Sequence, residues 1–165
     1  MRNILLILAL STLLSGCAEI LNTIATTPSV NYTRVSITAV RLESFSSSAP
    51  NGGSWDPLGG RPDIYMTLKE GNIISKRITF PNVYHGTQLT WQLKQPLLVT
   101  NLASAITIAF YDEEEGLNVG NDDYMGSVVF SPYLYKTGLN KYPSTLTLIS
   151  NSSPLVKVTI ELNWQ

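Results

Sequence analysis

The sequence of 165 residues predicts an all-β protein, folded as an antiparallel β-sandwich of about eight strands. Three observations lead to this prediction. From Arg34 onward, apolar and polar residues alternate in short runs, which is typical of strands with one buried face and one wet face. Residues rich in turn formers separate these runs, and no stretch after Asn31 has the apolar spacing of a helix of several turns.

The expected strands follow one another with turns between them. The last is the clearest, because Val156, Val158, Ile160 and Leu162 alternate with polar residues and should all face the core, together with the alternating residues of 106–110. The runs that we interpret as strands are 35–39, 64–68, 73–80, 89–93, 106–110, 128–130, 146–148 and 156–162. Two long connections, 44–62 and 113–122, interrupt this series, and long loops in compact domains often carry function.

Composition excludes several classes of protein. Hydrophobic residues make up 44% of the chain, which is enough for a packed core. The net charge is −1, so no excess of basic residues is available to neutralise the phosphates of a nucleic acid. One Cys and one His exclude an internal disulfide framework, a multi-Cys metal site and a two-His metal site. With no nucleophile motif either, we expect a binding protein rather than an enzyme.

The N-terminus has the anatomy of an export signal. Arg2 supplies a positive charge, and residues 4–14 are almost wholly apolar but too few to span a bilayer. The following Leu14-Ser15-Gly16-Cys17 resembles the bacterial lipobox. That resemblance implies cleavage before Cys17 and acylation of its thiol, and two or three acyl chains anchor a protein stably. An ordinary signal peptide with an incidental Cys is the alternative.

These features divide the chain into three parts. Residues 1–16 are the expected lipoprotein signal peptide, residues 17–31 an acylated tether, and residues 32–165 the sandwich domain. Ala18 follows the Cys where lipoproteins retained in the inner membrane usually have Asp. By that resemblance, we expect a palmitoylated protein of the bacterial outer membrane.

Acidic residues gather at the two long connections. Eight of the 12 Asp and Glu residues lie at or beside them, and no Lys or Arg occurs between Lys94 and Lys136. Crowded carboxylates repel one another unless protons or a cation neutralise them. Ca²⁺ is the hard cation that such a set of oxygens suits, although most charged runs are simply solvated.

The order of these acids resembles that of C2 domains, the β-sandwiches that bind calcium and phospholipid. In that family an Asp precedes the strand after the first loop, as in Asp63-Ile64-Tyr65-Met66. A strand ending in Tyr-Asp-x-Asp then leads to Asp-x-x-Gly, which Tyr111-Asp112-Glu113-Glu114 and Asp123-Tyr124-Met125-Gly126 resemble. Trp91 resembles the family's Trp on the fourth strand. The resemblance covers residues 32–165 and implies a C2-like eight-stranded sandwich.

The resemblance also implies a calcium site. Its carried-over ligands are Asp56, Asp63, Asp112, Glu114 and Asp123. Three features depart from the family pattern: Glu114 replaces Asp, Ile64 replaces Pro, and the loop between Asp112 and Asp123 is longer.

Apolar residues near the same loop tips are candidates for contact with a membrane or ligand. They are Trp55, Leu58, Leu117 and Val119. Trp suits the lipid interface because it has an apolar ring and a polar N–H. The alternative is that these side chains fold back over the sandwich.

Three functions therefore stay open at this stage. The first is a lipid-anchored, non-enzymatic module of the bacterial envelope that binds Ca²⁺ and, through it, a phospholipid membrane or other ligand surface. The second is a metal-free structural or assembly lipoprotein that docks a periplasmic envelope protein. The third is a carbohydrate-binding module with structural calcium.

Overall fold

The computed structural model describes residues 30–56, 60–114, 122–137 and 140–165. Contacts group Tyr32–Gln165 into one unit, which holds the strands of the described residues. Among the described residues, no helix is both long enough and apolar enough to cross a membrane. Cys17 and the expected tether lie outside the described residues, apart from Val30 and Asn31.

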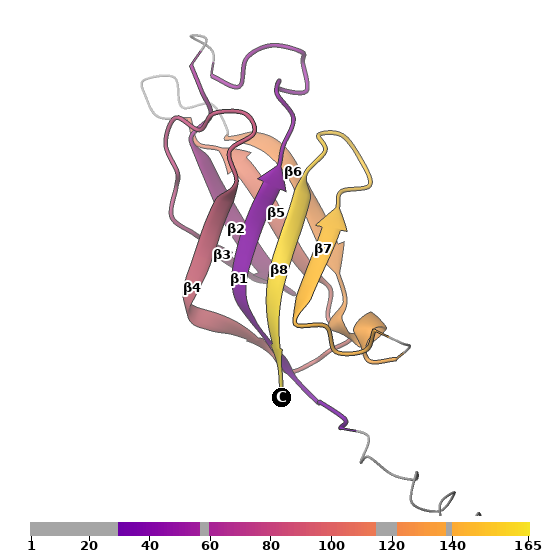
Figure 1. Ribbon diagram of the computed structural model, residues 1–165. Helices are drawn as coiled ribbons and strands as arrows, with labels where there is room; N and C mark the ends of the chain where they lie inside the picture. Colours follow the sequence, from indigo (N-terminus) through magenta and orange to yellow (C-terminus); the bar gives the residue numbers. More distant parts are fainter. Residues whose placement is uncertain (1–29, 57–59, 115–121, 138–139) are drawn as a thin grey trace, which may run out of the picture. The chain divides into compact units, whose positions relative to one another are not determined.

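The unit is an antiparallel β-sandwich of eight strands, which confirms the predicted fold class. The strands are β1 (Val35–Ser44), β2 (Ile64–Glu70), β3 (Ile73–Lys76), β4 (Leu89–Val99), β5 (Ile106–Asp112), β6 (Asp123–Phe130), β7 (Thr145–Ile149) and β8 (Lys157–Trp164). A short 3₁₀ helix, η1 (Pro132–Tyr135), follows β6. Figure 1 shows the two layers, with orders β4-β1-β8-β7 and β3-β2-β5-β6.

The core lies between the two sheets, where the alternation predicts it. Val156, Val158, Ile160 and Leu162 are all buried, as are Ile106, Ile108 and Phe110 of the facing sheet. Trp91 on β4 is also buried, and its ring packs against Phe80 and Phe110 with centroid separations of 5.0 Å and 5.7 Å. One apolar interior therefore joins both sheets.

The third strand is shorter than the sequence predicts. The run 73–80 yields a strand only at Ile73–Lys76, at the edge of its sheet. Phe80 then returns to β2 through a single bridge, with two backbone hydrogen bonds of 2.8 Å to Ile64. Ile73 and Ile74 of this edge strand and Ile78 after it are exposed.

The acidic connections leave the sandwich at one end. The residues after β1 and those just before β4 lie at the end opposite the C-terminus (Figure 1). The register agrees, since β1 pairs Leu42 with Leu89 and with Val158 at this end and Val35 with Val99 and Trp164 at the other. The end of β5 and the start of β6 meet at the same place as the start of β2.

Candidate metal site

The strand register brings the predicted acids to adjacent positions. Asp112, the last residue of β5, pairs with Ile64 on one side and with Asp123 on the other. Asp63 directly precedes Ile64, so three carboxylates occupy the same end of three neighbouring strands. This convergence follows from antiparallel pairing. β5 ends at this end of the sheet and lies between β2 and β6, which both begin there.

Backbone hydrogen bonds fix this junction. The Asp63 N–H donates to Oδ1 of Asp112 at 2.6 Å, and the Glu113 N–H donates to the Asp63 carbonyl at 2.8 Å. Oδ1 of Asp63 in turn accepts the N–H of Asn82, which belongs to the loop before β4. The three loops at this end are therefore joined through the two aspartates.

Asp112 is a buried carboxyl group in an environment that disfavours its negative charge. It is only 3% exposed, and its second oxygen, Oδ2, is buried without a hydrogen-bond partner. Burial, above all, raises the pKa of Asp112 to about 6, and the charges of Glu114, Asp63 and Asp123 add to the rise. The hydrogen bond from Asp63 opposes it but does not compensate for it. A buried carboxylate with an unsatisfied oxygen is costly unless a proton or cation neutralises it.

Glu114 is affected by the other predicted ligands. Burial raises its pKa, and the charges of Asp123, Asp56, Asp122 and Asp63 raise it further. These four carboxylates are thus close enough to act on one group, which agrees with a common acidic end. These negatively charged groups repel the Glu114 carboxylate, and a cation bound among them would relieve the repulsion.

Asp56 reaches this end from the long loop after β1. Its Oδ2 lies against Gly60, so closely that a Cβ built there would meet the oxygen at 2.1 Å. A side chain at position 60 would therefore displace the carboxylate. The lack of a Cβ at Gly60 is part of how the loop places Asp56.

Trp55 is buried in this structure rather than exposed at a loop tip, and its contact with a membrane stays a prediction. The side chain is 3% exposed, and its indole N–H donates to the Ser46 carbonyl at 2.9 Å. The residue folds back and belongs to the core cluster, as the alternative interpretation has it. The other three tip candidates, Leu58, Leu117 and Val119, lie outside the described residues.

Gly126 supports the site without supplying a ligand. It pairs with Phe110 just where the β5–β6 register shifts, and its φ is +126°. A Cβ at this position would meet the Pro154 carbonyl oxygen at 2.7 Å. The bulge therefore requires glycine, and it sets where Asp123 begins the strand.

Asp122 also lies at the acidic end, although we did not predict it as a ligand. Its Oδ2 accepts a 2.6 Å hydrogen bond from the Tyr65 hydroxyl, and its Oδ1 accepts the Glu114 N–H at 3.3 Å. Burial and this bond raise the pKa of Tyr65. The sequence places Asp122 directly beside Asp123. The resemblance to the Asp-x-x-Gly pattern, however, implies Asp123 as the calcium ligand.

The described carboxylates do not form a closed metal cage. Within the ranges that the structure describes, no group of three or more His, Cys, Asp or Glu side chains is arranged to hold a metal ion. Asp63 and Asp122 instead accept hydrogen bonds from protein donors. The donor set itself fits a hard divalent cation, since it consists of carboxylates and includes the unpartnered Oδ2 of Asp112.

Comparison with known proteins supports the fold. Neither the protein-family models nor the curated proteins include a match to this sequence. Among solved structures, the pair of C2 domains of Extended-Synaptotagmin 2 is similar, with 15% identity and a TM-score of 0.54 over 82% of this chain and 42% of that one. A human GIVD cytosolic phospholipase A2, in complex with a fluorophosphonate inhibitor and terbium chloride, is similar with 13% identity and a TM-score of 0.51 over 80% of this chain and 17% of that one.

These similarities define the class of fold. The chain has a C2-like β-sandwich. It spans less than half the length of both proteins, and at this level of identity the likeness concerns the fold alone.

Proposed function

We propose that this protein is a lipid-anchored, non-enzymatic binding module of the bacterial envelope. In this proposal the acidic end of the sandwich binds Ca²⁺ and, through the ion, a phospholipid membrane or another anionic surface. The C2-like fold supports the proposal, because it places loops from different parts of the chain at one end.

The observation that carries the calcium proposal is the buried and only partly hydrogen-bonded carboxyl group of Asp112. Its Oδ2 is buried and unpartnered while neighbouring carboxylates raise its pKa. A cation is the partner that would satisfy both the orphaned oxygen and the excess of negative charge. Asp56, Asp63, Asp112, Glu114 and Asp123 would hold the ion, with Asp122 released from Tyr65 as an additional ligand.

The anchor is the second part of the proposal and rests on the sequence. Cys17 follows Leu14-Ser15-Gly16, and Ala18 favours the outer membrane. Acylated Cys17 would hold the sandwich at a membrane surface, where a calcium site of modest affinity gains from the high local concentration of lipid. Metabolic labelling with a palmitate analogue should mark the wild type and not Cys17→Ser; labelling of the variant would contradict the anchor.

A metal-free assembly lipoprotein is the second candidate. One observation favours it, namely that the described carboxylates form no ready cage and that Asp63 already accepts a protein donor. In this alternative the acids would be solvated, and an envelope protein would dock on another surface of the sandwich.

Thermal unfolding of the full chain with and without Ca²⁺ separates the two candidates. An ion that binds only the folded state stabilises it by about 2.7 kcal/mol at a hundredfold excess over Kd. Mg²⁺ should give a smaller shift, because it resists dehydration and requires a tighter octahedron. Asp112→Asn combined with Asp63→Asn should abolish the calcium shift.

Glu161→Gln is the matched control. Glu161 is an exposed carboxylate on β8 and lies outside the acidic end, so this variant removes one charge without touching the proposed ligands. It should keep the full calcium shift. A wild-type melting curve that millimolar Ca²⁺ leaves unmoved would overturn the calcium proposal and favour the metal-free candidate.

A further inference from the structure

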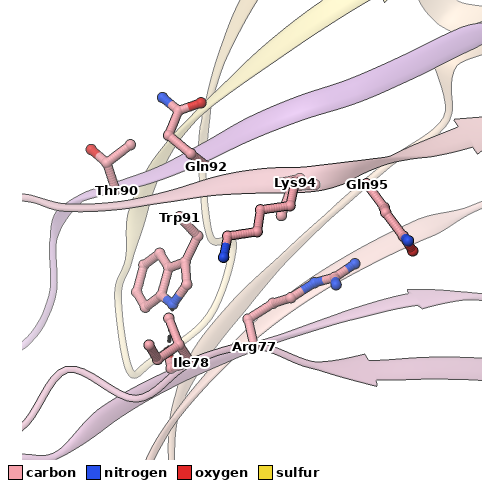
Figure 2. A pocket seen from close by; sticks show the side chains of 8 residues that line it. Arg77, Ile78, Thr90, Trp91, Gln92, Lys94 and Gln95 are labelled. Carbon is pink, nitrogen blue, oxygen red and sulfur yellow. Dashed lines mark hydrogen bonds between the residues drawn. The ribbon is translucent and has the colours of Figure 1, made fainter.

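A cleft of about 480 Å³ lies between the edge strands of the two sheets, and none of the proposed calcium ligands lines it. One wall comes from the residues after β3 and the other from β4 (Figure 2). Six of its lining residues matter for the argument: Arg77, Ile78, Trp91, Gln92, Lys94 and Gln95. None of the described residues that line the cleft is acidic, whereas two carry a positive charge.

A large bulge in β4 shapes one wall of the cleft. Ile37 of β1 pairs with Leu97, but Ala39, only two residues further on, pairs with Gln92. Residues 93–96 therefore have no partner in the β1 register, and the strand departs from the sheet there. Bulges redirect side chains, and this one carries Lys94 and Gln95. Figure 2 shows Lys94 extending into the gap between the strands.

Arg77 supplies the other charge from the opposite wall. Its backbone N–H donates to the Met66 carbonyl at 2.8 Å, which fixes the start of the side chain beside β2. Its Nε is buried and has no hydrogen-bond partner. A buried donor on a charged group is costly when it is left unpaired, so the hydrogen bonds of the described residues do not fully satisfy the Arg77 guanidinium.

Trp91 and Ile78 give the cleft an apolar surface. The Trp91 indole N–H already donates to the Ile78 carbonyl at 2.8 Å, which holds the ring in place and uses its donor. The Ile78 side chain is 75% exposed beside this bond. A ligand would thus meet cationic donors from Arg77 and Lys94 and an apolar surface next to them.

We propose that this cleft binds the phosphate group of a phosphomonoester, with Arg77 and Lys94 as its charged contacts. The planar guanidinium of Arg matches the oxygens of phosphate, and Lys adds a mobile point charge. The cleft is larger than a phosphate ion, so its volume leaves space for the esterified group beside Ile78. The site needs no metal and is independent of the calcium proposal.

Protection of a sheet edge is the competing explanation for part of this arrangement. Lys, Pro and bulges on edge strands discourage pairing with other chains, and β4 has Lys94, Pro96 and a bulge. That explanation does not account for the buried, unpaired Nε of Arg77, which belongs to the other sheet's side of the cleft.

Calorimetric titration of the full chain in the presence of a chelator tests the proposal. The probes are inorganic phosphate, phenyl phosphate, and vesicles of phosphatidylcholine with or without phosphatidic acid. We expect phenyl phosphate to bind more tightly than inorganic phosphate. Binding of phosphatidic acid vesicles alone would identify a lipid headgroup as the source of the phosphate, whereas binding of phenyl phosphate without the vesicles would identify a free ligand.

Charge-removing variants locate the site. Arg77→Gln and Lys94→Gln should each weaken binding at least tenfold, and Arg77→Lys should fall between Arg77→Gln and the wild type. Lys94 is exposed, so its variant should fold normally. The matched control is Lys157→Gln, the same change at an exposed position on β8, which should alter binding less than twofold. Failure of every probe to bind, or equal loss in Lys157→Gln, would overturn the proposal.

Discussion

The strands of the sandwich and its acidic end differ in how fully their buried polar groups are satisfied. Besides Asp112, the buried polar residues of the described chain are Ser36, Ser150 and Thr159. The side chain of each of these three has a hydrogen-bond partner: the Gln165 side chain for Ser36, the backbone N–H of Val156 for Ser150, and the Thr147 hydroxyl for Thr159. Asp112 differs, because one of its two oxygens has none.

The difference shows which part of the molecule depends on protons or a cation for its stability. The space between the sheets is apolar, and the buried side chains of Ser36, Ser150 and Thr159 have hydrogen-bond partners within the chain, so they require neither a proton nor a cation. The acidic end concentrates carboxylates around a buried, half-satisfied one, so its stability depends on protons or on a cation. Perturbations of the two regions should therefore respond differently to pH and to Ca²⁺.

The largest effect is expected in the interior. Phe110 is fully buried between the sheets and contacts Trp91. Phe110→Ala should lower the free energy of unfolding by about 3–5 kcal/mol, because it removes apolar burial and leaves a cavity. Urea denaturation measures this loss. It should be the same at pH 5 and pH 7, since the substitution removes no titratable group. A loss below about 1 kcal/mol would contradict the assignment of Phe110 to the core.

The acidic end should instead respond to pH. The folded chain raises the pKa of Asp112 from 3.8 to about 6, so the folded state holds this proton more tightly than the unfolded state. Without Ca²⁺, stability should therefore be highest below about pH 4 and fall as pH rises to about 6, by about 2–3 kcal/mol. Asp112→Asn cannot ionise and should flatten this part of the profile.

Denaturation in a chelating buffer at several pH values checks this prediction. Addition of Ca²⁺ at pH 7 should restore stability to the wild type and have little effect on Asp112→Asn. Stability that increases with pH between 4 and 6 would mean that Asp112 is stabilised as a carboxylate, contrary to the structure.

The contrast also explains what the sequence could predict. The alternation at positions 156–162 depends only on residues next to one another, and it correctly predicted a buried face. The resemblance to C2 domains implied that Asp63, Asp112 and Asp123 come together, and antiparallel pairing of the strands brings them to adjacent positions in the structure. Both predictions rest on regular strands.

The features that escaped prediction depend on irregular backbone. Trp55 is buried because its loop folds back to the Ser46 carbonyl, which no local pattern encodes. The role of Asp122 depends on a hydroxyl of Tyr65, distant in sequence. The cleft between Arg77 and Lys94 depends on a bulge in β4, and the order of residues does not show that bulge.

A smaller effect is expected for Trp55, which lies between the two regions. Trp55→Phe removes the N–H that donates to Ser46 and leaves that carbonyl without its partner. The cost should be about 1 kcal/mol in the free energy of unfolding. Because the side chain is buried, calcium-dependent vesicle binding should be unchanged once the variant is folded. A variant with normal stability but weaker vesicle binding would show that the loop opens and that Trp55 contacts lipid.

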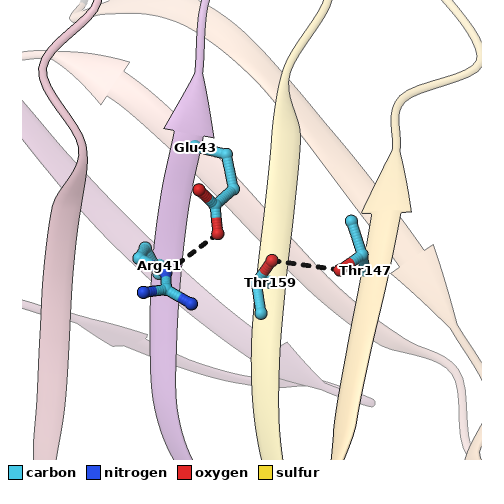
Figure 3. Close-up of polar contacts among 4 residues, drawn as sticks. All are labelled: Arg41, Glu43, Thr147 and Thr159. Atoms are coloured by element: carbon cyan, nitrogen blue, oxygen red, sulfur yellow. Dashed lines mark hydrogen bonds and ion pairs between the residues drawn. The ribbon is translucent and has the colours of Figure 1, made fainter.

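The smallest effect is expected on the outer face of the β4-β1-β8-β7 sheet. Figure 3 shows Arg41 and Glu43 joined on β1, with Nε and Oε1 2.8 Å apart. The Arg41 side chain is 45% exposed, so water screens the pair, and Glu43→Gln should change the free energy of unfolding by less than about 0.5 kcal/mol. Urea denaturation in low and high salt checks this. A loss above about 1 kcal/mol that salt does not reduce would show that the charges of this face, like those of the acidic end, contribute to stability.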